Sequence, residues 1–319
     1  AGLPKEPALQ ENFYGVQILD RQVWVVGYYG TILHSTDSGL TWEIQQSPTQ
    51  NALFRVRFTN PKRGWISGSY GSILHTTNGG QSWSAQPSNT SEHLFGLTFV
   101  NEQVGWTVGS RGTILQTRDG GSSWNNASVA EDLTFSDVAF VNATRGWIAG
   151  EFGAIFHSAN GGKSWIKQKS PVEVSFASGE SRNLFALLFT EPETGLAFGL
   201  DGVILKTRNG TTWEVIRQSK KTNSSAGANH LFASAPSNGR LWAVGERGTL
   251  LQSDSEGKSW QESRAESRVS LNGIGFGTNG LGLIAGNRGI ILRTEDGGTT
   301  WKRHKIVLQG QGKGTIQAR

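Results

Sequence analysis

Three histidines occupy one place in a repeated pattern, and their imidazoles could bind a metal. His34, His75 and His157 each follow a turn glycine by four residues. Zinc binds imidazole nitrogen at about 2 Å, so one ion would need the rings to meet at one point. Equivalent positions of successive repeats point in different directions instead. In the other repeats the position holds Gln116, Lys206, Gln252 and Arg293. We therefore expect no metal and no cofactor, and interpret these histidines as polar side chains of the scaffold.

A recurring hairpin contains acidic side chains whose carboxylates could take part in catalysis. Its first copy reads Ser35-Thr36-Asp37-Ser38-Gly39-Leu40-Thr41-Trp42. The acidic side chain can accept hydrogen bonds from nearby backbone, and the glycine supplies a positive φ angle. The position that we assign to this structural role, the Asp-box position, holds Asp37, Asn78, Asp119, Asn160, Asn209 and Asp296. Acids of different repeats could converge for glycoside hydrolysis, so that chemistry stays open as an alternative.

A short turn combines constant glycines with changing neighbours. In the first copy Gly27 and Gly30 enclose Tyr28 and Tyr29, and the enclosed pair differs in every later copy. Tyr and Arg are common anchors of protein interfaces. We predict that a protein partner binds the large side chains of these turns, which are Tyr28, Tyr29, Tyr70, Arg111, Phe152, Arg247 and Arg288. A long linker would add positive charge through Arg217, Lys220 and Lys221. The alternative is that exposed turns drift in sequence and that these charges are merely solvated.

The elements that position these residues follow from the spacing of the hairpins. Each hairpin ends in a tryptophan, and these are Trp42, Trp83, Trp124, Trp165, Trp213, Trp260 and Trp301. They are 41, 41, 41, 48, 47 and 41 residues apart. Between them lie short β-branched or aromatic runs bounded by Gly, Asn and Ser, which indicate strands. A period of about 40 to 45 residues with four strands is typical of a β-propeller. The sequence predicts an all-β fold, a seven-bladed propeller of four-stranded antiparallel blades.

The repeats also predict the domain limits and the faces of the ring. We expect an N-terminal arm at 1–12, a single propeller at 13–307 and a flexible C-terminal tail at 308–319. The seventh repeat supplies its own fourth strand at 301–307, so the ring can close by blade packing alone. The changing turns should lie on one face together with the long linkers, and the hairpins on the opposite face.

The middle of each first strand predicts the channel. Small residues occupy this place in five repeats, where strands crowd towards the axis: Gly15, Gly96, Ala186, Ala233 and Gly273. Arg55 and Asp137 take the same place in repeats two and four. We therefore expect a polar channel.

Composition narrows the class of protein. The 319 residues include 43 glycines and no cysteine, which excludes disulfides and zinc–thiolate sites. The formal charge of +5 comes without a basic tract, so no nucleic-acid partner is expected. No apolar run approaches the roughly 20 residues of a membrane-spanning helix. The chain has no Met, even at position 1. We interpret this as removal of a signal peptide and predict an exported protein, in the periplasm, an equivalent space or outside the cell.

The repeat from Gly64 to Trp83, GWISGSYGSILHTTNGGQSW, resembles those of the photosystem II stability/assembly factor family, within the Asp-box or bacterial neuraminidase repeat propellers. The resemblance runs from about Tyr14 to Val307. It implies a non-catalytic factor in the thylakoid lumen that binds a nascent reaction-centre subunit through an arginine-rich patch. Here the arginines are scattered over several repeats, and the chain resembles exported bacterial relatives equally well.

Sialidases share the hairpin box, but there it is structural and far from the chemistry. Their catalysis resembles an arginine clamp with a tyrosine nucleophile. The four tyrosines of this chain all lie in the first two repeats, and its tryptophans occupy regular scaffold positions. We therefore expect no enzyme, and predict a scaffold that binds a protein partner as an assembly or stability factor for a membrane-associated complex. The alternative is a carbohydrate-active propeller, either a sialidase-like hydrolase or a lectin-like binder.

Overall fold

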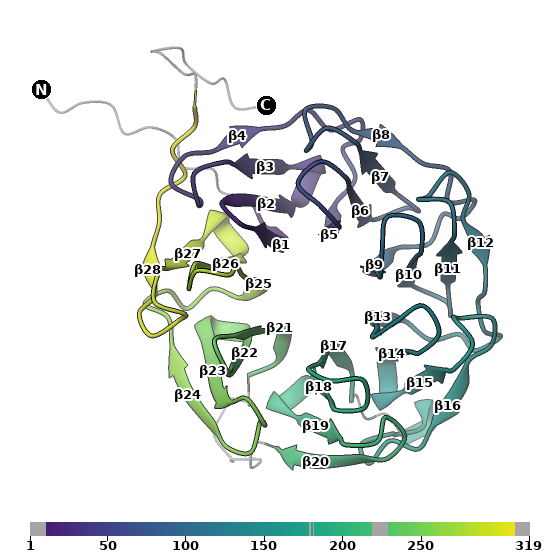
Figure 1. Ribbon diagram of the computed structural model, residues 1–319. Helices are drawn as coiled ribbons and strands as arrows, with labels where there is room; N and C mark the ends of the chain where they lie inside the picture. The colour runs from purple at the N-terminus through teal and green to yellow at the C-terminus, as the bar shows by residue number, and fades with distance from the viewer. Residues whose placement is uncertain (1–10, 179, 181, 219–228, 310–319) are drawn as a thin grey trace, which may run out of the picture.

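The computed structural model describes residues 11–178, 180, 182–218 and 229–309. They form seven four-stranded sheets arranged radially around a central axis (Figure 1), and each sheet consists of four consecutive antiparallel strands. This confirms the predicted seven-bladed propeller. Its helical segments are single 3-10 turns, namely η1 (Tyr28–Gly30), η2 (Glu151–Gly153), η3 (Phe176–Ser178), η4 (Leu200–Gly202), η5 (Glu246–Gly248) and η6 (Asn287–Gly289). None of the helical turns in the described residues has the length or the apolar character of a membrane-spanning helix.

The two inner strands of each blade carry the core. The first strands line the axis and are β1 (Phe13–Leu19), β5 (Leu53–Phe58), β9 (Leu94–Phe99), β13 (Phe135–Phe140), β17 (Leu184–Phe189), β21 (Leu231–Ser237) and β25 (Leu271–Phe276). The second strands are β2 (Gln22–Gly27), β6 (Gly64–Gly68), β10 (Gly105–Gly109), β14 (Gly146–Gly150), β18 (Gly195–Gly199), β22 (Arg240–Gly245) and β26 (Gly282–Gly286). The second strands are almost wholly buried because each sheet packs against a neighbour on both faces.

The two outer strands complete each blade. The third strands are β3 (Ile32–Ser35), β7 (Ile73–Thr76), β11 (Ile114–Thr117), β15 (Ile155–Ser158), β19 (Ile204–Thr207), β23 (Thr249–Asp254) and β27 (Ile291–Thr294). The fourth strands are β4 (Glu43–Ile44), β8 (Ser84–Ala85), β12 (Asn125–Asn126), β16 (Ile166–Gln168), β20 (Trp213–Arg217), β24 (Trp260–Arg264) and β28 (Lys302–Arg303). Most fourth strands are short because only their first residues pair with the third strand.

The hydrophobic core lies between blades. One buried cluster joins Trp24 and Val26 of the first blade to Leu53, Ile66 and other residues of the second, and similar clusters fill the other inter-blade spaces. The cluster between the seventh and first blades contains Leu283 and Val25, with Leu308 packed against it. The blades are therefore held together by the same apolar contacts that bury their faces.

Ring closure differs from the expected packing of blades alone. Within the described residues each sheet keeps its own four strands, but the fourth strand of the last blade ends at Arg303 instead of continuing to Val307. The following segment crosses to the first blade, where Trp42 N–H donates to the Val307 carbonyl (2.8 Å) and Gln309 N–H to the Trp42 carbonyl (2.8 Å). Leu308 and Gln309, expected in the tail, thus hold the ring closed. Residues 1–10 of the predicted arm and 310–319 of the predicted tail lie outside the described residues.

Candidate partner-binding face

Each second strand joins its third strand through one repeated turn. Its middle residue lies in the left-handed region in all seven blades, with φ between +52° and +56°. These residues are Tyr29, Tyr70, Arg111, Phe152, Asp201, Arg247 and Arg288. Such a conformation costs roughly 1–2 kcal/mol for a residue other than glycine. Neighbouring segments must therefore hold the turn.

Hydrogen bonds to the inner-strand linkers hold the turn. Within the first blade, Tyr28 N–H donates to the Asn12 carbonyl (2.8 Å). The next residue of the turn reaches the following blade: Tyr70 N–H donates to His93 Nδ1 (3.3 Å), and Arg288 N–H donates to Asn12 Oδ1 (3.1 Å). The glycine is required by space as well, since a Cβ on Gly71 would lie 2.0 Å from a backbone carbonyl of the linker. The turns of Tyr70 and Arg288 are thus each fixed by two successive linkers.

The side chains on these turns remain accessible. Tyr28, Tyr29 and Tyr70 are 52%, 56% and 66% exposed. Arg247 and Arg288 are exposed as well, and the Arg111 side chain is 75% exposed. The blades that carry them follow one another around the ring (Figure 1), from β21–β24 through β25–β28 and β1–β4 to β9–β12. We call the set Arg247, Arg288, Tyr28, Tyr29, Tyr70 and Arg111 the Tyr/Arg arc.

Ion pairs leave the arginines of the arc largely available. Arg111 lies 3.8 Å from Glu92, and Arg247 lies 3.9 Å from Glu246. Exposed pairs at such distances contribute about 0–1 kcal/mol. The turns of the fourth and fifth blades carry Glu151 and Asp201 without an arginine, whereas Glu246 of the sixth blade stands beside Arg247. The face therefore has a cationic, aromatic arc and a more acidic remainder.

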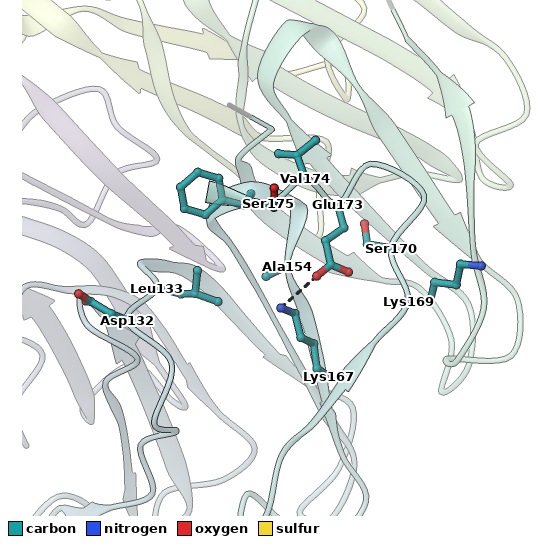
Figure 2. Close-up of a pocket in the computed structure, with 10 residues that line it drawn as sticks. Asp132, Leu133, Ala154, Lys167, Lys169, Ser170, Glu173, Val174 and Ser175 are labelled. Carbon is teal, nitrogen blue, oxygen red and sulfur yellow. Dashed lines mark ion pairs between the residues drawn. The ribbon is translucent and has the colours of Figure 1, made fainter. Parts of the chain in front are cut away.

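Phe152 of the predicted set lies apart from the arc, in a pocket of about 750 Å³. Figure 2 shows this pocket, in which Lys167 forms an ion pair with Glu173 (3.0 Å). Burial opposes the charge on Lys167, but hydrogen bonds to Glu173 and Glu131 outweigh it and raise the pKa of the lysine. Residues of two linkers and of the turn that contains Phe152 line the pocket. Sequence reasoning did not find it, because its residues come from linkers without a repeated pattern.

The remaining predicted binding residues are not on the turns. The Arg217 side chain is 20% exposed and pairs with Glu262 of the next blade (2.8 Å), and it also donates to the Gly202 carbonyl (2.6 Å). It therefore links two blades. Lys220 and Lys221 lie outside the described residues.

An incomplete ring of aromatic side chains around the channel, interrupted at Ser136 and Asn272, was not predicted. The second residue of the first strand is aromatic in five blades: Tyr14, Phe54, Phe95, Phe185 and Phe232. The strand register shifts at this residue in every blade, a β-bulge that re-aims a side chain. Successive rings touch, with centroids 5.6 Å apart for Tyr14–Phe54 and 5.0 Å for Phe54–Phe95. We call these five residues the aromatic collar.

The collar adjoins the turns. His93 contacts Tyr70 of a turn (4.9 Å between centroids) and Phe95 of the collar (6.0 Å). Burial is the main cause of the raised pKa of Tyr14, and electrostatic interaction with the nearby Tyr28 raises this pKa further. The sequence signal for the collar was the aromatic residue that recurs just before the small residue at the axis. Simple alternation along the strand does not reveal the bulge that turns it towards the turn face.

The predicted structural residues lie at the other end of the blades. Asp37 accepts hydrogen bonds from Thr41 N–H (2.8 Å), Thr41 Oγ1 (2.6 Å) and Ser35 Oγ (2.7 Å). Burial would raise the pKa of Asp37, but these bonds and one from Leu40 N–H outweigh it and lower the pKa to about 2. The hairpins also bond to the loops between first and second strands, as in Gly79 N–H to the Lys62 carbonyl (2.8 Å). The hydrogen bonds described for the Asp37 carboxylate thus all lie within its own hairpin.

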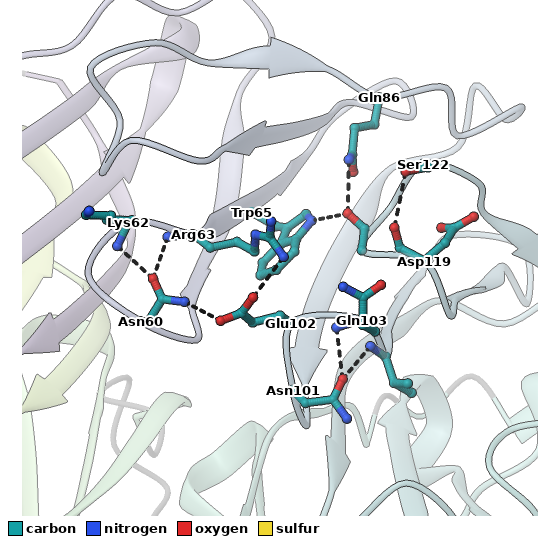
Figure 3. Close-up of polar contacts among 12 residues, drawn as sticks. Asn60, Lys62, Arg63, Trp65, Gln86, Asn101, Glu102, Gln103, Asp119 and Ser122 are labelled. Carbon is teal, nitrogen blue, oxygen red and sulfur yellow. Dashed lines mark hydrogen bonds and ion pairs between the residues drawn. The ribbon is translucent and has the colours of Figure 1, made fainter.

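Tryptophans of the first four blades each bond to the hairpin of the following blade. Figure 3 shows Trp65 Nε1 donating to the Gly120 carbonyl of the next hairpin (3.0 Å), which also accepts from Gln86 (3.2 Å). Trp24, Trp106 and Trp147 make the equivalent bond. All twelve tryptophans are described, and none is among the exposed large apolar residues. The alternative of a sugar-binding tryptophan platform therefore has no residues to support it.

The three histidines lie against these tryptophans. His34 and His75 stack on Trp24 and Trp65, with centroids 4.9 and 5.0 Å apart, and burial lowers their pKa values. His157 lies similarly beside Trp147. The described residues contain no group of three or more potential metal ligands.

Comparisons with known proteins agree with this architecture. A family model described as photosynthesis system II assembly factor YCF48 matches residues 40–94, 86–173 and 207–293, which is more than half of the chain. A solved structure described as YCF48 bound to D1 peptide has 22% identity and a TM-score of 0.71, covering 91% of this chain and 93% of that one. YCF48 from Cyanidioschyzon merolae has 18% identity and a TM-score of 0.69, with 92% and 98% covered. The family resemblance inferred from the repeats is confirmed.

Hydrolases share the fold more distantly. An ancestral GH74 enzyme has 15% identity and a TM-score of 0.73, but this chain covers only 47% of its length. No curated protein matches the sequence of the chain. At such identities the likeness concerns the fold, since one fold hosts many unrelated functions.

Proposed function

Because the chain belongs to the photosynthesis system II assembly factor YCF48 family, we propose that it is a non-catalytic assembly factor that binds a protein partner on its turn face. The observation that carries the proposal is the Tyr/Arg arc, in which rigid turns present accessible tyrosines and arginines on consecutive blades. Such side chains supply most of the binding energy at protein interfaces. A turn that is already fixed loses little further conformational entropy on binding.

The composition of the arc defines the partner. Three arginines and three tyrosines favour an extended segment that combines carboxylates with apolar or aromatic side chains. A relative was solved with a D1 peptide, and we propose that this chain also binds a segment of a membrane-complex subunit. The aromatic collar extends the apolar surface towards the axis.

Absence of catalysis is part of the proposal. The carboxylates of the hairpins are engaged in local hydrogen bonds, and the family is named for assembly. Export to a lumenal or periplasmic space also belongs to the proposal. Cell fractionation with a protease-protection assay tests it, and a cytoplasmic protein would contradict it.

Peptide binding tests the function. A fluorescein-labelled D1 peptide is titrated with the wild-type chain and with the variant Arg111→Glu/Arg247→Glu/Arg288→Glu. We expect affinity to fall about 30-fold, on the scale of three exposed charge contacts of roughly 0.7 kcal/mol each. The melting temperature should stay unchanged, because none of the three side chains is buried.

The matched control reverses three charges on the hairpin face. Lys62→Glu/Arg118→Glu/Lys163→Glu changes the net charge by the same amount with exposed side chains. It should leave peptide affinity within about twofold. Equal losses in both triple variants would mean that net charge alone drives binding and would remove the arc from the proposal. No binding by the wild type would overturn the choice of partner.

A further inference from the structure

The channel beneath the aromatic collar contains two partly buried arginines. Five blades place glycine or alanine at the axis, and this leaves room for the long side chains of the other two blades. Arg55 and Asp137 face each other there, with Arg55 Nη2 3.8 Å from Asp137 Oδ2. Arg57, two residues further along the same strand, lines the same space. The predicted polar channel is thus confirmed, and it holds two guanidinium groups against one carboxylate.

The carboxylate is already occupied by other donors. Asp137 Oδ2 accepts from Leu187 N–H (2.9 Å), and Asp137 Oδ1 accepts from Val138 N–H (3.0 Å). At 3.8 Å its approach to Arg55 is an ion pair without a hydrogen bond. Asp137 therefore leaves most of the arginine donors unmatched.

The arginines have donors without partners. Arg55 Nε is buried and makes no hydrogen bond, and the hydrogen bond that Arg57 makes is to the carbonyl of its own neighbour Val56 (3.1 Å). Burial, followed by the charge of Arg55, lowers the pKa of Arg57 to about 10, so this side chain remains charged at neutral pH. A buried charge without a partner is costly. The channel has one positive charge more than its carboxylate balances.

We propose that the channel binds a small monovalent anion, a halide or a short carboxylate such as formate, between Arg55 and Arg57. The space has a volume of about 50 Å³, which suits an ion of a few atoms. A second cavity of about 350 Å³ also has Arg57 and Asp137 in its lining, together with Glu191 of the loop after β17, and it gives the ion a route from the hairpin side past this further carboxylate. This site is separate from the Tyr/Arg arc.

Direct observation of the ion is the first test. Crystals of the full chain are grown in sodium bromide, and anomalous diffraction locates bromide. The proposal expects a peak between the guanidinium groups of Arg55 and Arg57. Density at that place without anomalous signal would mean that water satisfies the arginines and would overturn the proposal.

Solution binding provides the second test. Chloride-35 NMR line broadening is measured for the wild type, for Arg57→Met and for Asp137→Asn. Arg57→Met should abolish the specific broadening, whereas Asp137→Asn should strengthen affinity at least about fivefold because it removes the competing negative charge. Arg118→Met, an exposed arginine on a hairpin, is the control and should bind as the wild type does. Equal broadening in all four proteins would overturn the proposal, because it would place the anion elsewhere.

Stability gives a readout that does not depend on crystals. At constant ionic strength, the change in melting temperature on replacing sulfate by formate should be about 2–4 °C more positive for the wild type than for Arg57→Met, since sulfate itself stabilises folded proteins generally. The control Arg118→Met should show the same change in melting temperature as the wild type. Arg57→Met should lack the part of this change that comes from binding at the site. Identical responses in both variants would show a general salt effect and contradict a site at Arg57.

Discussion

The hairpins and the turns repeat equally often but use their side chains in opposite ways. In the hairpins Asp119 accepts from Ser123 N–H (2.9 Å) and Ser123 Oγ (2.6 Å), and the neighbouring Gly120 carbonyl accepts from Trp65 of the preceding blade. In the turns the backbone makes the contacts, and side chains such as Tyr70 point to solvent. The hairpin position keeps Asp or Asn in six blades because its side-chain oxygen accepts hydrogen bonds from the hairpin backbone. The turn residue is variable because only its backbone is engaged.

The contrast separates scaffold from surface within a single repeat. Asp and Asn alternate in the hairpins because the serine or threonine hydroxyl adapts: it donates to Asp119 Oδ2 but accepts from Asn78 Nδ2 (2.9 Å from Ser82 Oγ). Substitution is tolerated there only where the hydrogen bonds survive. In the turns tyrosine, arginine, phenylalanine and aspartate share one backbone geometry. The fold therefore imposes no requirement on the turn side chain, which leaves it free to serve binding.

Removing an inter-blade tryptophan should give the largest effect. Trp65 is fully buried and stacks on Phe99 with centroids 3.8 Å apart. Trp65→Ala should lower the free energy of unfolding by about 3–5 kcal/mol through the cavity, beyond the lost hydrogen bond. Urea denaturation followed by circular dichroism measures it. Tyr70→Ala in the same blade is the control and should change stability by less than about 0.5 kcal/mol. Similar losses in both variants would break the division between scaffold and surface.

A glycine of the repeated turn should tolerate substitution less well than a glycine in open space. Gly71 has φ +69°, and a Cβ there would meet the Thr90 carbonyl. Gly71→Ala should cost about 2–4 kcal/mol from strain and overpacking. Gly239 has a similar φ of +71° with nothing within 4 Å, so Gly239→Ala should show the strain alone, about 1 kcal/mol. Equal losses at the two glycines would mean that the linker gives way, and that the turns are less rigid than their hydrogen bonds indicate.

The sequence predicted the structure within each repeat better than the contacts between neighbouring repeats. Trp spacing and hairpin signatures are local, so the number of blades and of strands in each blade followed directly. In the sixth blade the acid stands one place earlier, and Asp254 accepts from Glu256 and Lys258 N–H (both 3.1 Å) in place of the usual pattern. The collar and the Phe152 pocket depend on bulges and on linkers of neighbouring blades. Those contacts arise only when the ring closes, and a pattern within one repeat cannot reveal them.

Neutralising one hairpin carboxylate should have the smallest effect and tests the hairpin side of the comparison by pH. Hydrogen bonds from Thr294 and Thr300 lower the pKa of Asp296 to about 2, below its ordinary value of 3.8. A lowered folded-state pKa stabilises the protein above the unfolded value, and this contribution is lost as the pH falls from 3.8 through about 2. Because Asp296 is exposed, the contribution should stay below about 1 kcal/mol.

Asp296→Asn should therefore be slightly less stable than the wild type at pH 7, and the difference should shrink towards pH 2. Urea unfolding of both proteins across this range measures it. Asn78→Asp is the reciprocal variant: it should acquire the acid-dependent contribution that the wild-type second blade lacks, because Ser82 can reverse its hydroxyl as Ser123 does beside Asp119. A difference between Asp296→Asn and wild type that is constant with pH would show that the carboxylate is not preferentially hydrogen-bonded in the folded state. The constancy of the hairpin would then have to come from its backbone alone, as in the turns, and the contrast between the two regions would lie only in exposure.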